Sequence, residues 1–401
     1  MPDISKIVRN PPLIRFDHID MLRGLAAGLV LCGHLRAFLF VNYGSLADPG
    51  PLTKVFYTIT GLGHQAVIIF FAMSGFLVGG KALDDMLSAR WSWPRYLLRR
   101  LTRLWIVVIP ALVATLVFDR IGVGLTGGRG YDGSLYTTYV SGPSLNAPLD
   151  HSISTFLGNI AFLQNVCVPI FGTNGPMWSL ANEFWYYILF PLAASIFLVH
   201  YCRWQRVLAI GFLASAVLAL PWWLLKAGLI WATGAGAARV PYLALALRHC
   251  VIRIASILVV FCALVGTKYS AGAFIDDLTF GLLIAAVLPI LSALPSFAKR
   301  YRSLARGVAE ISYTLYLTHF PFLALIIFVA FAPDRFYPGL MGAVAYGGLL
   351  GLAAAWSVAF WWCFERHTNR LFRYLAVRMS LDGGKISTLA NSPRKNIRIL
   401  S

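Results

Sequence analysis

The feature that most constrains this sequence is a series of long apolar segments divided by short polar stretches. A bilayer core about 30 Å thick needs roughly 20 apolar residues to be crossed by a helix. Segments of this kind recur ten times, the sixth being weaker and rich in Gly and Ala. The predicted spans are residues 21–41, 58–80, 101–118, 178–199, 206–225, 227–247, 250–267, 277–296, 308–331 and 340–364. The pattern predicts an all-α polytopic membrane helix bundle of about ten transmembrane helices.

Composition excludes the main alternatives to a membrane protein. Of 401 residues, 58% are hydrophobic and 12% are charged, and the mean hydropathy is +0.71. Soluble domains have about 45–50% apolar and about 25% charged residues. An ordinary soluble protein, a disordered chain and a coiled coil are therefore all excluded. The six cysteines form no C-x-x-C pair, so no zinc site is predicted, and we expect no metal.

The distribution of cations predicts the topology. Net charge is +18, and most of the 34 Lys and Arg residues fall in segments that are cytoplasmic if both termini lie inside. Cationic residues stay on the cytoplasmic side of membranes, so we expect this charge to reflect topology rather than a nucleic-acid partner. We expect a cytoplasmic segment over 1–18, a membrane domain over 19–370 and a basic, disordered cytoplasmic tail over 371–401. The apolar piece 153–171 is expected to be interfacial or re-entrant within the outside loop 119–177.

Ionisable residues at membrane depth are costly and usually functional. The first span contains Asp20, Arg23 and His34. Arg23 and His34 are eleven residues apart, which places them on one helix face and roughly 16 Å apart along the axis. Asp20 falls near the same face. The alternative to a functional role is a structural one, with a hydrogen-bonded histidine and an arginine that extends to the membrane surface. A structural role accounts poorly for three ionisable residues on one face.

Two further motifs lie near the expected cytoplasmic side. The Ser74-Gly75 pair favours close helix packing over a nucleophile. A basic cluster follows at 95–103, in which Arg99 and Arg103 share a helix face. It is either an anchor at the membrane surface or an anion site for phosphates, for which arginine is well suited.

Two more motifs lie in later spans. Ser179 and Glu183 share a face of the fourth span, where Glu183 is either functional or a residue near a helix start. Ser312, Tyr316 and His319 share a face of the ninth. His319 precedes Pro321, so it is either functional or satisfies a carbonyl that the proline frees.

Together these motifs resemble the acyltransferase-3 family of polytopic membrane acyltransferases. They occur in the family's order, and the resemblance covers residues 14–370. The matching pieces are Asp20-x-Leu22-Arg23-Gly24 with His34, Phe70-Phe71-x-x-Ser74-Gly75-Phe76-Leu77, Arg99-Arg100-x-x-Arg103, Trp178-Ser179-Leu180-x-x-Glu183, and Ser312-Tyr313-x-x-Tyr316-Leu317-x-His319-x-Pro321.

The resemblance implies transfer of an acyl group, expected to be acetyl, from acyl-CoA to a hydroxyl of a carbohydrate or lipid-linked glycan acceptor. It also implies the inner membrane of a bacterium. His34 is the expected general base, since a neutral buried imidazole suits this role near pH 7. Asp20 or Glu183 would orient it, and Arg23 would hold phosphate or gate the site. The expected catalytic residues are His34, Arg23, Asp20, Glu183 and His319, and the expected donor-binding residues are Arg99, Arg100, Arg103 and Ser74.

Other interpretations remain open at this point. Direct attack by the acceptor is favoured because neither G-x-S-x-G nor H-x-x-x-x-D occurs, but His319 or Ser74 as an acyl carrier is an alternative. A polytopic transporter would also place Arg, His and Glu in a membrane bundle. No duplicated half is visible, which argues against it. A purely structural scaffold explains none of the embedded charges. The sequence leaves the oligomeric state open.

Overall fold

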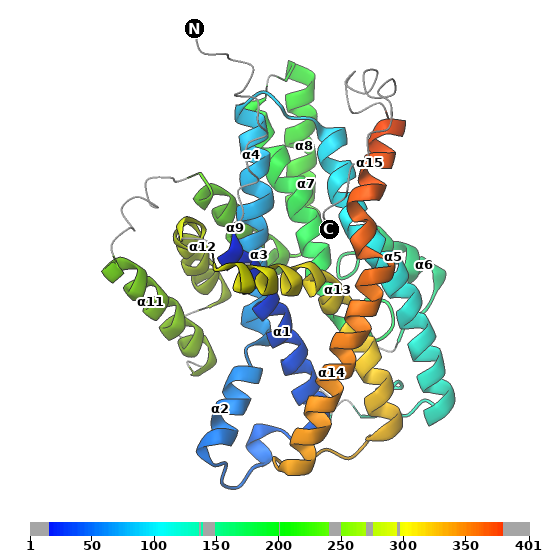
Figure 1. The fold of residues 1–401 in the computed structure, drawn as a ribbon. Helices are drawn as coiled ribbons and strands as arrows, with labels where there is room; N and C mark the ends of the chain where they lie inside the picture. Colours follow the sequence, from blue (N-terminus) through cyan, green and yellow to red (C-terminus); the bar gives the residue numbers. More distant parts are fainter. Residues whose placement is uncertain are drawn as a thin grey trace, which may run out of the picture.

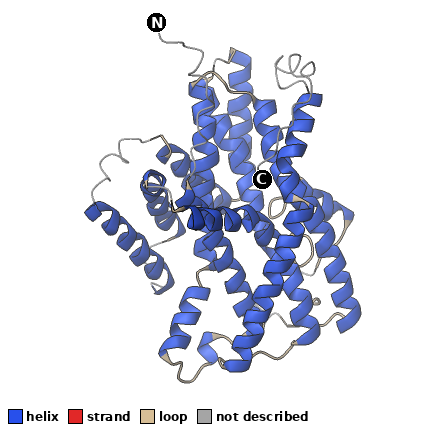
Figure 2. Cartoon of the chain, viewed as in Figure 1, coloured by secondary structure: helices blue, strands red, loops and turns tan. Residues whose placement is uncertain are grey.

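The computed structural model describes residues 16–135, 138, 149–199, 201–239, 250–269, 276–294 and 297–379. Within these ranges the chain is built from helices and loops, without a strand (Figure 2). Five helical segments are long and apolar enough to cross a membrane: Asp17–Leu39, Pro51–Leu87, Trp93–Thr126, Lys299–Ala330 and Leu340–Arg378. The all-α membrane class is confirmed, while the count of ten spans and the side of each terminus stay predictions.

The helices follow the chain in the order shown in Figure 1. They are α1 (Asp17–Leu39), α2 (Pro51–Thr60), α3 (Gly63–Ser74), α4 (Gly80–Leu87), α5 (Trp93–Thr126), α6 (Ile153–Ile160), α7 (Trp178–Leu198), α8 (Arg203–Ala219), α9 (Trp222–Ala237), α11 (Cys250–Tyr269), α12 (Asp277–Ala293), α13 (Lys299–Ala330), α14 (Leu340–Cys363) and α15 (Thr368–Arg378). A π-helical turn at Gly75–Gly79 joins α3 to α4.

Pro221 corrects the predicted span 206–225. Helix α8 ends at Ala219 and α9 begins at Trp222, so the apolar run is two helices rather than one. Proline has no backbone N–H and its ring clashes with the preceding turn, which ends a helix unless neighbours compensate. The weaker predicted span 227–247 falls partly in α9, and its residues 240–247 lie outside the described ranges.

Two other boundaries differ from expectation. In the apolar piece 153–171, only Ile153–Ile160 is helical and the remainder is irregular loop. Helix α15 continues to Arg378, so the first residues of the tail that we expected to be disordered are helical. Residues 380–401 of that tail lie outside the described part of the chain.

Helix α1 lies in the core of the bundle and packs most extensively against α13 (Figure 1). Gly24 permits this approach, because a Cβ atom there would lie 2.3 Å from Cγ2 of Val308. The same helix contacts α3, and α13 contacts α5 and α14. The Arg23-Gly24 pair therefore combines a charged side chain with a close helix crossing.

The Ser74-Gly75 motif is also a close crossing, as the sequence favoured. A Cβ atom on Gly75 would lie 1.9 Å from the carbonyl oxygen of Trp231 in α9. From the other side, a Cβ atom on Gly234 would lie 2.3 Å from the carbonyl oxygen of Ala72. Small residues facing one another let helix backbones approach within a membrane. The π-helical turn begins at this crossing, and such turns are frequent at functional sites.

We expect Gly75→Ala to destabilise the protein by at least about 1–3 kcal/mol, the usual range for overpacking. The obstacle is backbone, which a rotamer change cannot remove. Thermal unfolding in detergent would measure the effect. Gly28→Ala is the matched control, because a Cβ atom at Gly28 meets nothing within 4 Å. Equal melting temperatures for the two variants would contradict this account of the crossing.

Candidate active site

A cavity of about 230 Å³ lies where α1, α3, α5, α7 and α13 meet. Five of the residues expected from the sequence line it: Arg23, Ser74, Arg100, Arg103 and Glu183. They come from four helices that are widely separated in the chain. Apolar and aromatic side chains form most of the remaining wall, so the charged groups face largely apolar neighbours.

Three guanidinium groups give this cavity its cationic character. Arg23 pairs with Asp20 at 3.2 Å, and Arg103 interacts electrostatically with Glu183 and Glu365. Arg100 lies over the ring of Tyr187, 5.9 Å from its centroid. The buried Nε atoms of Arg23 and Arg100 make no hydrogen bond among the described residues. The cavity therefore retains donors for an anion, and arginine binds phosphate especially well.

Arg99 lies outside this cavity, although it shares the sequence cluster. Its guanidinium stacks over the ring of Phe372 in α15, 4.7 Å from the centroid. Arg100 and Arg103 line the cavity, and Arg99 ties α5 to the helix that follows α14. The side chains of the cluster therefore diverge, and of the three arginines in the motif only Arg100 and Arg103 reach the cavity.

Glu183 is the acceptor for two hydroxyl groups at the cavity wall. Ser74 donates to Oε1 of Glu183 at 2.7 Å, and the Tyr187 hydroxyl donates to the same oxygen. The indole N–H of Trp231 donates to the Ser74 hydroxyl at 3.1 Å. Ser74 is thereby fixed as a donor towards a carboxylate, in the same turn that makes the Gly75 crossing.

The two histidines expected from separate motifs meet. Nδ1 of His34 lies 2.8 Å from Nε2 of His319, and the two rings stack at an interplanar angle of 13°. His319 is fully buried, and its ring lies 6.4 Å from the ring of Tyr316, which lines the cavity. Tyr316 in turn bonds Ser179 at 2.7 Å between hydroxyl oxygens. The pair is therefore one helical turn from the cavity wall.

The hydrogen bonds of His319 determine how protons are placed on this pair. Nδ1 of His319 lies 2.7 Å from the carbonyl oxygen of Leu315, which can only accept, so Nδ1 carries the hydrogen. Nε2 of His319 is then the acceptor, and Nδ1 of His34 donates to it. In neutral His34 the lone pair consequently lies on Nε2, which makes that atom the basic one.

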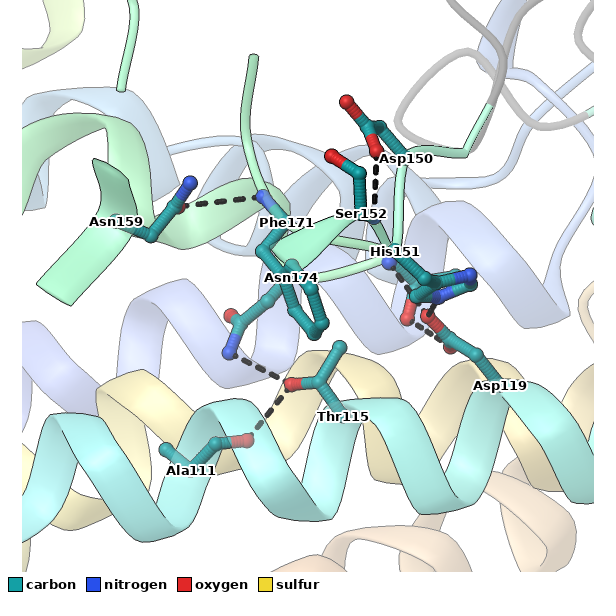
Figure 3. A network of polar contacts seen from close by, with 10 residues as sticks. Ala111, Thr115, Asp119, Asp150, His151, Ser152, Asn159, Phe171 and Asn174 are labelled. Atoms are coloured by element: carbon teal, nitrogen blue, oxygen red, sulfur yellow. Dashed lines mark hydrogen bonds and ion pairs between the residues drawn. The ribbon is translucent and has the colours of Figure 1, made fainter. Parts of the chain in front are cut away.

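A side chain from a distant loop satisfies the carbonyl that Pro321 frees. Proline lacks the N–H that would bond the carbonyl four residues earlier, which is Leu317. Nδ2 of Asn174 donates to that carbonyl at 3.0 Å. The same nitrogen lies 3.2 Å from the Thr115 hydroxyl, as Figure 3 shows. His319 instead bonds Leu315, so its position is not explained by the freed carbonyl.

The loop that carries Asn174 is fastened to α5 by a buried carboxylate. Asp119 is fully buried and accepts from His151 at 2.8 Å (Figure 3). It also accepts from the backbone N–H and the hydroxyl of Thr173. Gly172 has φ +56°, and a Cβ atom there would lie 2.3 Å from Oδ2 of Asp119. Nearby, the Thr155 hydroxyl and the Ser152 N–H hold the pKa of the Asp150 carboxyl below its usual value. This network fixes the loop before α7 begins.

We expect Asn174→Leu to cost about 1–3 kcal/mol, because the Leu317 carbonyl would be buried without a partner. We also expect weaker acyl transfer, since Leu317 lies two residues before His319. Chemical unfolding and activity would be compared with Asn42→Ala, because Asn42 is an exposed residue whose side-chain oxygen accepts from Arg335 at 3.1 Å. If Asn174→Leu matched that surface control in both measurements, the loop would not support the histidine pair.

Sequence reasoning missed several residues of this region. Glu365 is buried and accepts from the backbone N–H and the hydroxyl of Thr314, at 3.2 and 2.6 Å, close to Arg103. Its signal was an acidic residue at the end of an apolar span. Asn174 and Asp119 gave no comparable signal, because their partners are distant in the sequence.

Comparison with known proteins agrees with the geometry. Residues 16–362 match the model of a family described as an acyltransferase domain, acyltransferase-3. The chain belongs to the acyltransferase-3 family of membrane acyltransferases. The family expected from the motifs is thereby confirmed. It is a family of acyltransferases, which favours the enzyme over the transporter interpretation.

One relative among curated proteins is Acyltransferase MdmB of Streptomyces mycarofaciens, which is 28% identical over 185 residues. That alignment covers 45% of this chain and 40% of MdmB. No solved structure matches the chain.

Proposed function

We propose that the protein transfers an acyl group, expected to be acetyl, from acyl-CoA to a hydroxyl of a carbohydrate-type acceptor. The observation that carries this proposal is the convergence of the separate motifs on one buried region. Arg23, Arg100 and Arg103 line one cavity, and the His34–His319 pair lies beside Tyr316 at its wall. A thioester donor with nucleotide phosphates requires an anion site and, at the far end of its pantetheine arm, a basic imidazole.

The cationic cavity would hold the donor. The Nε atoms of Arg23 and Arg100 supply buried donors for phosphate oxygens, and Arg103 adds a third charge. Arg23 lies roughly 16 Å from His34 along α1, at 1.5 Å per residue. An extended pantetheine arm along α1 would carry the thioester from the arginines towards the histidines.

His34 would act as the general base. As the acceptor oxygen attacks the thioester carbonyl, its proton passes to Nε2 of His34. The C–S bond then breaks, the acyl–oxygen ester forms, and the CoA thiolate leaves. The thiolate takes the proton from Nε2 of His34, which restores the neutral imidazole. His319 would orient His34 and hold its Nδ1 hydrogen, as the 2.8 Å contact between the rings supports. Direct transfer needs no acyl-enzyme, and Ser74 would then keep Glu183 in position.

The membrane location completes the proposal. Five apolar helices place the chain in a lipid bilayer. We propose the inner membrane of a bacterium, with Arg23, Arg100 and Arg103 towards the cytoplasm because most Lys and Arg residues belong on that side. Donor and acceptor would then approach from opposite faces of the membrane.

The test is release of CoA thiol by purified protein in lipid nanodiscs. Acetyl-CoA is supplied with and without a glycolipid extract, and free thiol is followed with a chromogenic disulfide. We expect release that depends on both the protein and the extract. Folded protein that releases no thiol with any extract would overturn the proposal and favour the transporter interpretation, which flux assays in sealed vesicles would then examine.

A further inference from the structure

A second cavity, of about 350 Å³, lies among α3, α7, α9 and the start of α12. Its volume falls within the roughly 300–1,000 Å³ usual for ligand pockets. Helix α7 lies between the two cavities and presents one face to each of them. Ser179 and Glu183 face the first cavity, whereas Trp178 and Asn182 face the second. The proposed chemistry uses none of the polar groups of this second cavity.

Asn182 is the residue that marks the second cavity as a ligand site. Its side chain is fully buried and lines the cavity. The Tyr186 hydroxyl, one turn further along α7, interacts with the Asn182 amide, but neither polar atom of that amide makes a hydrogen bond of normal geometry within the part of the chain described. The neighbouring Tyr186 hydroxyl donates to the Leu224 carbonyl at 2.7 Å. Leaving a buried polar group unpaired costs about 1–3 kcal/mol. A ligand that both donates and accepts would offset this cost, and adjacent hydroxyl groups do both.

Aromatic rings form the apolar side of the cavity. The indoles of Trp178 and Trp223 lie 6.2 Å apart between centroids, tilted by 63°. The His64 ring stacks on Trp178 at an interplanar angle of 15°. Flat apolar surfaces of this kind contact the C–H face of a ring ligand and leave its polar edge free for hydrogen bonds.

Charged groups occupy the remaining side, and they balance one another. Nε2 of His64 lies 2.8 Å from Oδ2 of Asp277, and Nζ of Lys226 lies 2.7 Å from Oδ2 of Asp276. Both aspartate side chains are 52% exposed, and Asp276 also accepts from the backbone N–H and the hydroxyl of Thr279. Because each carboxylate already has a cationic or imidazole partner, the cavity favours a neutral ligand rich in hydroxyl groups over an ion.

From this arrangement we propose that the second cavity binds a neutral sugar ring of the acceptor, with Trp178 and Trp223 against its apolar face and Asn182 on its hydroxyl edge. The role as acceptor site rests on the proposed function. The cavity is also close to the helix that carries the proposed base. A Cβ atom on Gly33, the residue before His34, would lie 2.7 Å from the Thr60 carbonyl oxygen and 3.9 Å from Gly63. The turn of α1 that carries His34 therefore adjoins the start of α3, where His64 lies.

Saccharide binding can be measured without any acyl donor. The full chain in nanodiscs is mixed with methyl α-D-glucopyranoside, methyl α-D-mannopyranoside or methyl α-L-rhamnopyranoside, and saturation transfer to the ring protons is recorded by NMR. The test variants are Trp223→Ala and Asn182→Ala. Trp222→Ala is the matched control, because Trp222 is 73% exposed and absent from the cavity wall, whereas Trp223 is 43% exposed and lines it.

We expect saturation transfer to at least one glycoside in the wild type and in Trp222→Ala, reduced at least about tenfold in both test variants. No transfer to any glycoside in the wild type would overturn the proposal, as would equal transfer in Trp223→Ala. Displacement of the glycoside by cyclohexanol at equal concentration would also overturn it, because the hydroxyl edge would then contribute nothing. If the protein binds a glycoside but releases no CoA thiol, the sugar site stands and the proposed acyl transfer is rejected. The failure of one proposal can therefore be distinguished from the failure of the other.

Discussion

His34→Ala is expected to lower kcat for acyl transfer by about 10²- to 10⁴-fold, the usual contribution of a general base. The reason is the fixed tautomer, in which the Leu315 carbonyl and His319 direct the His34 lone pair to Nε2. KM for acyl-CoA should stay within about twofold, because the lining of the cationic cavity does not include His34. Steady-state kinetics at saturating acceptor would measure both constants.

Two further variants make this prediction specific. His18→Ala is the control on the same helix. The His18 ring packs on the ring of Phe297, with 4.1 Å between their centroids, and His18 lies sixteen residues before His34 in the sequence. His319→Leu removes the acceptor for the His34 Nδ1 hydrogen and should lower kcat less than His34→Ala does, with KM unchanged. A His34→Ala protein that is folded and fully active would remove His34 from the mechanism.

Arg100→Gln is expected to raise KM for acetyl-CoA by about 10- to 100-fold with little change in kcat. A hydrogen bond to a charged group contributes about 1.5–3 kcal/mol, and each 1.4 kcal/mol is about tenfold in affinity. Arg100 lines the cavity and has a buried Nε without a partner among the described residues. Arg100 is a better choice for substitution than Arg103. Arg103 interacts electrostatically with Glu183 and Glu365, so its removal would leave these two carboxylates without that charge.

The neighbouring residue provides the control for this prediction. Arg99→Gln should leave KM unchanged, because Arg99 stacks on Phe372 outside the cavity. Acetyl-pantetheine, which lacks the nucleotide phosphates, provides a second control. With this short donor, the wild type and Arg100→Gln should have similar KM values. A rise in KM of equal size for both donors would show that Arg100 does not recognise phosphate.

Much of the first cavity was accessible to sequence reasoning because its residues belong to local motifs. Helical spacing placed Ser179 with Glu183, and Tyr316 with His319, on common faces. The structure then joins those faces through the Ser179–Tyr316 hydrogen bond of 2.7 Å. Several of the expected spans coincide with helices of the structure for a related reason, since a long apolar segment in a bilayer satisfies its backbone polar groups by forming a helix.

What sequence reasoning missed depends on contacts between distant residues. The spacing placed Arg99 and Arg103 together, but packing of α15 takes Arg99 away from the cavity. Asn174 meets the Leu317 carbonyl across 143 positions, and His64 meets Asp277 across 213. No local periodicity encodes such pairs. Pro221 did carry a local signal, but the apolar composition around it concealed the break between α8 and α9.

The most direct test of the account follows the acyl group itself. Acetyl-CoA labelled with ¹⁴C in the acetyl group is incubated with the protein in nanodiscs and a glycolipid extract, and the label in an alkali-labile ester of the extract is counted. The account predicts one labelled ester for each CoA thiol released by the wild type, and only background label with His34→Ala. Wild-type protein that releases thiol while all label appears as free acetate, or His34→Ala protein that forms ester at the wild-type rate, would contradict it.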